Sequence, residues 1–222
     1  MLQALFYKEW IKTKKVILVA IILFACFITY SFINIEQLFR INGAVQTWVN
    51  IILKDITLLS GLEYLPILFG ILLALAQYVP EMTNKRLKLT LHLPLSETKT
   101  IFSMLLYGFV VLTILFIVTY ALLVSGMSFY LPYEIIMASV WTSLPWFIAG
   151  IIAYFLSAWI CVEPVWRQRI FNTIIGICIL SFFYIDSKSG AYASFLPYMI
   201  ACLILVSFYP FYSMNRFKDG IQ

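Results

Sequence analysis

Charged residues are scarce in this chain of 222 residues: they make up 11% of it, against 63% hydrophobic and 18% aromatic residues. An average soluble domain is about 25% charged. Such a composition is typical of a protein that crosses a membrane several times. The net charge of +5 does not indicate nucleic-acid binding, because the basic residues form short clusters beside apolar runs. In those positions they orient the chain and contact anionic membrane lipid.

The motifs of common enzyme classes are also missing. His92 is the only histidine, which excludes HExxH and similar metal-ligand spacings, and no GxSxG turn is present. No glycine is followed by lysine, so the chain lacks the GxxxxGK[ST] phosphate loop. The sequence therefore predicts no catalytic residue, no metal site and no cofactor. The cysteines form no CxxC pair and lie in or beside apolar segments, where they predict packing rather than redox chemistry: Cys26, Cys161, Cys178 and Cys202.

What the chain does contain is long apolar runs separated by short polar segments. A helix needs about 20 apolar residues to cross the hydrocarbon layer. The runs predict an all-α polytopic membrane protein with one transmembrane domain over residues 1–222 and no soluble domain. Its six expected spans are approximately 16–35, 62–80, 101–125, 140–162, 170–185 and 192–213.

The basic residues predict an orientation for these spans. If the chain crosses six times, twelve of its fifteen Lys and Arg residues fall on the side of the N-terminus. Only Arg40, Lys54 and Lys188 fall on the other side. Cytoplasmic loops carry such an excess of Lys and Arg. We therefore expect a multi-pass protein of the bacterial inner membrane with both termini cytoplasmic and with the first span retained as an anchor.

Residues 1–15 predict an amphipathic helix on the cytoplasmic surface. Leu2, Leu5, Phe6 and Trp10 share one face at helical spacing, and the lysines at 8, 12 and 15 lie largely away from it. A simple basic flank that orients the first span is an equal and compatible interpretation.

The outer connection 36–63 is too apolar for a free loop and predicts an interfacial helix with Trp48 at the headgroup level. Glu63 follows it. If the second span begins near Ile56, Glu63 lies inside the membrane and is a functional candidate. If the span begins near Tyr64, Glu63 lies at the outer boundary, which is the interpretation we favour.

Two features are expected in the segment 100–162. An outer turn over 127–134 separates the third and fourth spans, and Pro145 either kinks the fourth helix or marks its first turn. Small residues allow a neighbouring helix to pack closely on that fourth helix: Ala149, Gly150, Ala153, Ser157 and Ala158.

The inner loop 81–99 is longer than a turn requires. Residues Glu81–Leu93 can form a short helix, which Pro94 ends, and Ser96 is placed to cap the third span. A rigid helix between two spans can transmit a displacement to both of them. A basic loop that faces lipid and binds no partner is the alternative interpretation.

These features resemble the ABC-2 type transporter permeases, which are membrane subunits of ATP-binding-cassette exporters. The shared features are the N-terminal interfacial "elbow" helix, the six spans with both ends inside, and an inner loop in which Glu81 precedes a basic cluster and the element LPLS at Leu93–Ser96. Glu97 departs from the basic residue that many members have after this element. In such permeases the loop carries a coupling helix, which binds the ATPase subunit. The resemblance implies these ATPase-coupling residues: Glu81, Lys85, Arg86, Leu87, Lys88, Leu89, His92 and Pro94.

The resemblance also implies a function and partners. The chain would pair with a second permease subunit, identical or homologous, and with ATPase subunits that bind ATP and Mg²⁺. The substrate would be hydrophobic or amphipathic. Two other functions stay open: a secondary transporter or channel that works alone, and a membrane scaffold or assembly protein that transports nothing.

Overall fold

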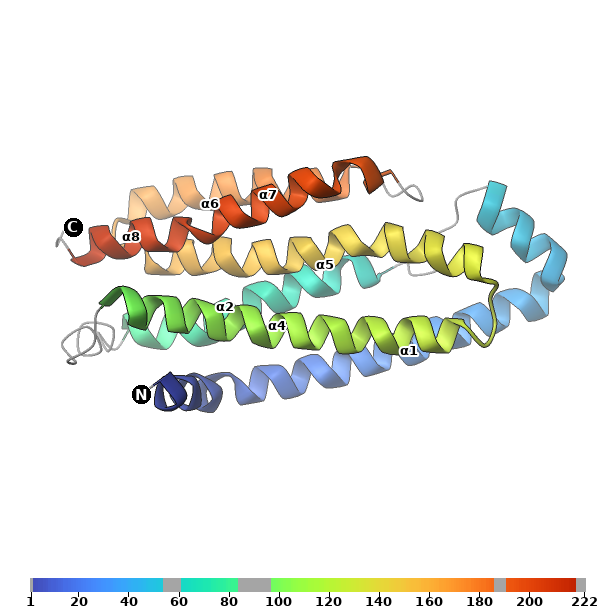
Figure 1. The fold of residues 1–222 in the computed structure, drawn as a ribbon, viewed down its shortest axis with the longest axis horizontal. Helices are drawn as coiled ribbons and strands as arrows, with labels where there is room; N and C mark the ends of the chain where they lie inside the picture. Colours follow the sequence, from blue (N-terminus) through green and yellow to red (C-terminus); the bar gives the residue numbers. More distant parts are fainter. Residues whose placement is uncertain (1, 54–60, 84–96, 186–190, 219–222) are drawn as a thin grey trace.

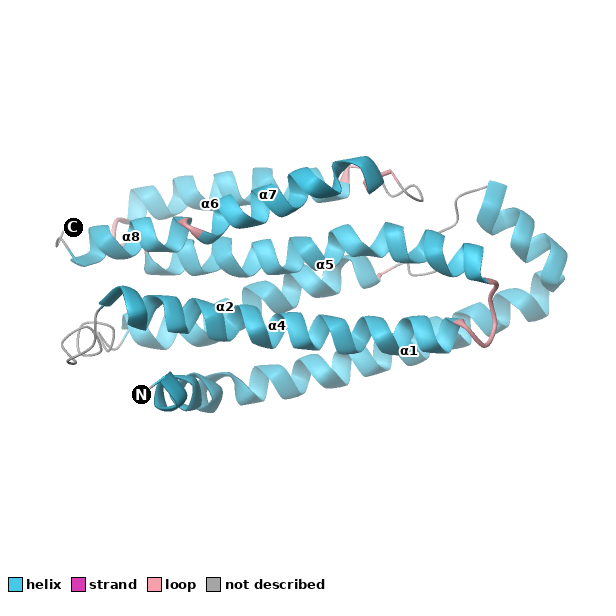
Figure 2. Cartoon of the chain, viewed as in Figure 1, coloured by secondary structure: helices cyan, strands magenta, loops and turns pink. Residues whose placement is uncertain are grey.

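The computed structural model describes residues 2–53, 61–83, 97–185 and 191–218, and these are almost entirely helical, without strands (Figure 2). The all-α prediction is confirmed for this part of the chain. The helices are α1 (Leu2–Leu53), α2 (Leu65–Thr83), α4 (Glu97–Met127), α5 (Tyr133–Val162), α6 (Trp166–Ser181), α7 (Leu196–Ser207) and α8 (Tyr209–Lys218). Three short 3₁₀ turns precede or follow them: η1 (Leu62–Tyr64), η2 (Phe182–Tyr184) and η3 (Ala193–Phe195).

The helices form one elongated bundle in which successive passes run in opposite directions (Figure 1). The ends of the described chain, at the start of α1 and the end of α8, lie at the same end of the bundle. The last residue of α2 and the first residue of α4 also lie there. Helix α5 occupies the middle and packs against α2, α4, α6, α7 and α8.

Not every pass is long and apolar enough to cross a membrane. Among the described residues five helical segments are: Gln3–Ile41, Leu62–Thr83, Lys99–Met127, Tyr133–Val162 and Ala193–Met214. Helix α6, with 16 residues, is not one of them. It packs against α5 where the fifth span was expected, over 170–185, so the sixth crossing stays a prediction.

Helix α1 is longer than the first expected span in both directions. It continues past Ile35, where the first span was expected to end, and its only non-helical backbone is a kink at Gly43. Gly43 has φ 71° and ψ 164°, values that glycine adopts without the steric penalty other residues incur. The expected helix around Trp48 is confirmed as the last part of α1, which turns away from the bundle axis after this kink (Figure 1).

Helices α2 and α5 cross at unusually short range because glycines meet there. A Cβ atom built on Gly70 would lie 2.1 Å from the carbonyl oxygen of Gly150, and one built on Gly150 would lie 2.7 Å from that of Pro66. Only glycine permits such backbone contact. The close packing predicted at Gly150 is therefore confirmed, with α2 as the partner.

Prolines have different effects along the chain. Pro145 lies in the interior of α5, twelve residues after its start at Tyr133, so the expectation that it marks a first turn is wrong. Pro80 lies within α2, which continues to Thr83. Pro210 has no N–H group to donate to a carbonyl oxygen of the preceding turn, and the helix is interrupted beside it, at Phe208 between α7 and α8. A turn lies between Met127 and Tyr133, close to the predicted bounds 127–134, and its place on the outer side stays a prediction.

Candidate functional site

The last turns of α2 place a carboxylate inside the bundle. Glu81 is only 1% exposed, and its Oε1 atom is 2.5 Å from Lys12 Nζ and 2.9 Å from Lys8 Nζ. Both lysines belong to α1, and they lie four residues apart, which places them on one helical face. The start of α1 is thus bound to the end of α2 by two ion pairs.

A second carboxylate completes this cluster. Glu9 is 2% exposed, and its Oε1 atom accepts a hydrogen bond of 2.7 Å from Lys12. Two lysines and two glutamates give a formal charge of zero. Neutrality matters because a buried charge is tolerated only when it is paired and hydrogen-bonded. We call Lys8, Glu9, Lys12 and Glu81 the α1–α2 charge cluster.

The same face of α1 also contacts α4. Thr13 Oγ1 is hydrogen-bonded to the hydroxyl of Tyr107 at 2.7 Å, and the ring of Phe6 packs edge-on against the Tyr107 ring with centroids 5.5 Å apart. The start of α1 therefore joins both helices that flank residues 84–96.

A buried polar link deeper in the bundle joins α2, α4 and α5. The Gln77 side chain donates to the carbonyl oxygen of Met104 at 2.8 Å and accepts from the Tyr154 hydroxyl at 2.9 Å. Gly108 of α4 makes room for this hydroxyl, because a Cβ atom there would lie 2.1 Å from it. Three helices are thus held in register at the level next to the charge cluster.

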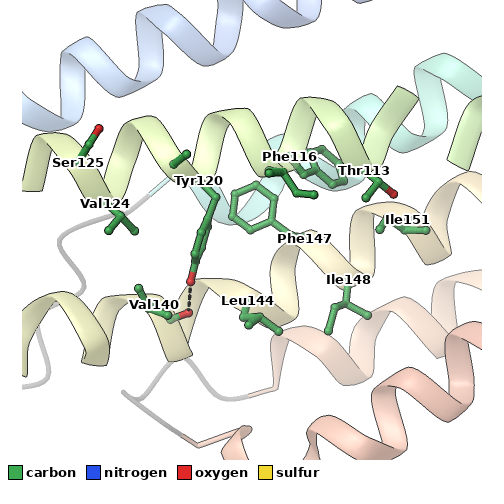
Figure 3. A pocket seen from close by; sticks show the side chains of 12 residues that line it. Thr113, Phe116, Tyr120, Val124, Ser125, Val140, Leu144, Phe147, Ile148 and Ile151 are labelled. Atoms are coloured by element: carbon green, nitrogen blue, oxygen red, sulfur yellow. Dashed lines mark hydrogen bonds between the residues drawn. The ribbon is translucent and has the colours of Figure 1, made fainter. Parts of the chain in front are cut away.

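At the opposite half of the bundle a groove of about 740 Å³ opens between α4 and α5 (Figure 3). Phe116 and Phe147 line it, and the Tyr120 hydroxyl donates to the Val140 carbonyl oxygen at 3.0 Å across it. None of its lining residues is charged. Ligand pockets have about this size, with apolar walls and few polar groups, so the groove suits an apolar chain or ring system.

Glu63, the possible intramembrane residue, lies in η1 at the far end of α2 from Glu81. Its carbonyl oxygen accepts a 2.6 Å hydrogen bond from the Tyr184 hydroxyl, and the rings of Tyr64 and Tyr184 stack with centroids 5.8 Å apart. Glu63 is the second residue of the candidate span Leu62–Thr83, where a helix end would meet a membrane boundary.

Of the predicted coupling residues the structure places only Glu81. The other seven lie outside the described residues: Lys85, Arg86, Leu87, Lys88, Leu89, His92 and Pro94.

The α1 residues of the charge cluster were missed by the sequence analysis. The lysines at 8, 12 and 15 were expected to lie away from the apolar, membrane-facing side of residues 1–15, but no partner was predicted for them, whereas Lys12 is only 13% exposed and pairs with Glu9 and Glu81. The spacing of Glu9 and Lys12, three residues apart on one helical face, was the available signal.

Within the ranges that the structure describes, no group of three or more His, Cys, Asp or Glu residues could hold a metal ion. No protein-family model, no curated protein and no solved structure matches the chain.

Proposed function

We propose that this chain is a permease subunit of an ATP-binding-cassette transporter, resembling the ABC-2 type, and that separate ATPase subunits drive it. The observation that carries the proposal is the α1–α2 charge cluster. It joins the start of α1 to the end of α2 immediately before residues 84–96, which contain most of the expected coupling residues. A force applied to the loop after Glu81 would reach two helices at once.

The distribution of charge supports a six-span topology with cytoplasmic ends. Cations gather at the end of the bundle where α1 starts and α8 ends (Figure 1). Arg40 lies near the opposite end, in the last third of α1. An excess of Lys and Arg marks the cytoplasmic side. The described cations at the first end are Lys8, Lys12, Lys14, Lys15, Lys99, Arg167, Arg169 and Arg216.

In this proposal the first turns of α1 are the elbow helix. In Figure 1 its first turns are seen nearly end-on, whereas the middle part of α1 runs along the bundle. Exposed Tyr7, Trp10 and Ile11 are suited to the membrane interface, while Glu9 and Thr13 face the bundle. The elbow would therefore contact lipid on one side and the charge cluster on the other.

The mechanism follows from these contacts. Closure of the ATPase subunits on ATP binding displaces the loop after Glu81. The ion pairs to Lys8 and Lys12 pass this displacement to α1, and the contact of Thr13 with Tyr107 passes it to α4. The three helices then move together with α5, which packs closely on α2, and this motion alternates access to a pathway between two permease subunits.

The groove between α4 and α5 supports a hydrophobic or amphipathic substrate. Its walls offer no charged group that could replace the hydration shell of an ion (Figure 3). Such a groove accepts molecules that already partition into the bilayer.

The test is purification of the tagged chain from its native membranes in mild detergent. We expect an ATPase with a phosphate loop to copurify in a fixed ratio, and its ATP hydrolysis to change when the permease is present. The K85E/R86E/K88E variant should lose this ATPase, because it reverses the charge of the expected docking surface. A K14E/K15E variant, which changes exposed lysines of α1, is the control and should retain it.

Other outcomes would overturn the proposal. A lone oligomer without an ATPase would favour a secondary transporter or channel. Binding of unrelated membrane proteins in place of an ATPase would favour a scaffold. Equal ATPase binding by the wild type and by K85E/R86E/K88E would refute the role of the loop.

A further inference from the structure

A second buried charge cluster lies where α5, α6 and α8 meet. Glu163 follows the last residue of α5 and is fully buried. Its carboxylate accepts hydrogen bonds from the Ser213 hydroxyl and, at 3.0 Å, from Arg216 Nη1, both of α8. We call Glu163, Arg169, Ser213 and Arg216 the α5–α8 charge cluster.

Arg169, in the first turn of α6, gives this cluster a surplus of positive charge. Its Nη2 atom donates to the carbonyl oxygen of Glu163 at 2.7 Å and not to the carboxylate. Glu163 therefore binds Arg216 through its carboxylate and Arg169 through its main-chain carbonyl oxygen, and the formal charge of the cluster is +1. A partly buried surplus charge is unfavourable unless an anion neutralises it.

The buried polar groups of the α5–α6 hairpin that lack a hydrogen-bond partner are all donors, which would also favour an anion. Three buried N–H donors of the α5–α6 hairpin have no acceptor among the described residues: Trp159 Nε1, Arg169 Nε and Asn172 Nδ2. In the described part of this hairpin no buried side-chain acceptor is left without a donor. Buried donors normally find partners, whereas each of these three donors lacks an acceptor.

Aromatic side chains place the cluster at the depth of lipid headgroups. The Arg169 guanidinium lies 5.6 Å from the centroid of the Trp166 ring, and that of Arg216 lies 5.9 Å from the centroid of the Tyr212 ring. Both rings are exposed on the surface of the bundle. Exposed Trp and Tyr at helix ends sit at the membrane interface, where phospholipid phosphates also lie.

We propose that Arg169 and Arg216 bind the phosphate of an anionic phospholipid at the junction of α5, α6 and α8. Glu163 holds the two guanidinium groups in place through its carbonyl oxygen and its carboxylate, and Arg169 Nε is a donor without an acceptor. Arginine is suited to this role because its planar fork binds phosphate through two parallel hydrogen bonds. The inference does not depend on an ATPase partner, so it can fail or stand without the proposed function.

The test is a lipid titration of the purified chain, followed by native mass spectrometry, with phosphatidylglycerol and phosphatidylcholine as the probes. The wild type should bind phosphatidylglycerol selectively. R169K keeps the charge but removes Nε–H and the fork, and we expect about tenfold weaker binding, because a hydrogen bond to a charged group is lost. R167K makes the same exchange at an exposed neighbour and is the matched control; it should bind like the wild type.

Thermal melts of the three proteins serve as a folding check, and R169K should melt like R167K. Equal phosphatidylglycerol binding by R169K and R167K would overturn the proposal, because charge alone would then explain the attraction. Inorganic phosphate is titrated separately. If it binds with dependence on Arg169 while the two lipids bind equally, the site takes free phosphate and the lipid assignment is wrong.

Discussion

Replacing Lys12 with methionine tests whether the α1–α2 charge cluster joins the two helices. Methionine keeps an unbranched apolar stem of similar length, so the packing of the aliphatic part changes little. The exchange removes the ion pairs of 2.5 Å to Glu81 and 2.7 Å to Glu9. Two buried carboxylates then share Lys8 alone, and the formal charge of the cluster falls from zero to −1.

The expected loss of stability in K12M follows from the burial of the ion pairs. Removing one partner of a buried ion pair costs about 3–5 kcal/mol. Lys8 is 35% exposed, so water reaches this cluster and the lower end, about 3 kcal/mol, applies to K12M. For a chain of this length each kcal/mol lowers the melting temperature by about 2–4 °C. We therefore expect K12M to melt about 6–12 °C below the wild type.

The assay is a thermal melt of the purified chain in detergent, in which the fraction of protein that remains monodisperse is measured at each temperature. K14M is the matched control, because Lys14 is exposed on the same helix, and it should lie within about 0.5 kcal/mol of the wild type. The double variant E9Q/K12M restores a neutral pair of Glu81 and Lys8. It should melt above K12M, since neighbouring charges couple by about 0.5–3 kcal/mol.

Two results would refute this reasoning. If K12M and K14M melt together, the ion pairs of Lys12 do not stabilise the bundle. If E9Q/K12M melts below K12M, the loss in K12M comes from packing and not from an uncompensated buried charge.

The other contacts make predictions for the same thermal melt. Gly70→Ala places a methyl group 2.1 Å from the carbonyl oxygen of Gly150 and should lower the free energy of unfolding by about 1–3 kcal/mol. The control Gly176→Ala meets its nearest side-chain atom at 3.7 Å and should be neutral or slightly stabilising. Equal melting temperatures of the two variants would contradict the close contact of α2 and α5. Tyr154→Phe leaves the side-chain oxygen of buried Gln77 without its donor and should cost about 1–3 kcal/mol; wild-type melting would show that this link adds nothing.

The helical class and the approximate positions of five long apolar helices were predictable from the pattern of apolar residues. The turn between Met127 and Tyr133 and the close packing at Gly150 were expected and are found. Lengths were harder to predict, since α1 extends past Ile35 into residues that were expected to form a separate helix. Helical backbone satisfies its own hydrogen bonds in water and in lipid alike, so a polar residue does not end a helix.

The charge clusters were only partly predictable. Glu81 was named as part of the coupling loop, but the sequence offered no reason to pair it with Lys12, which lies 69 residues earlier. Glu163 was not considered at all, although it is buried and bound by Ser213 and Arg216 of α8. In both cases the partner comes from a distant helix, and helical periodicity carries no information on such pairs.

Composition and the length of the apolar runs were enough to determine that this protein is helical and belongs in a membrane, because each segment must satisfy its backbone and match the hydrocarbon layer by itself. Which charges are buried, and which helices they join, was decided only by the tertiary structure. An ion pair depends on the distance between two side chains, and the bundle alone brings the lysines of α1 within 3 Å of the carboxylate of α2.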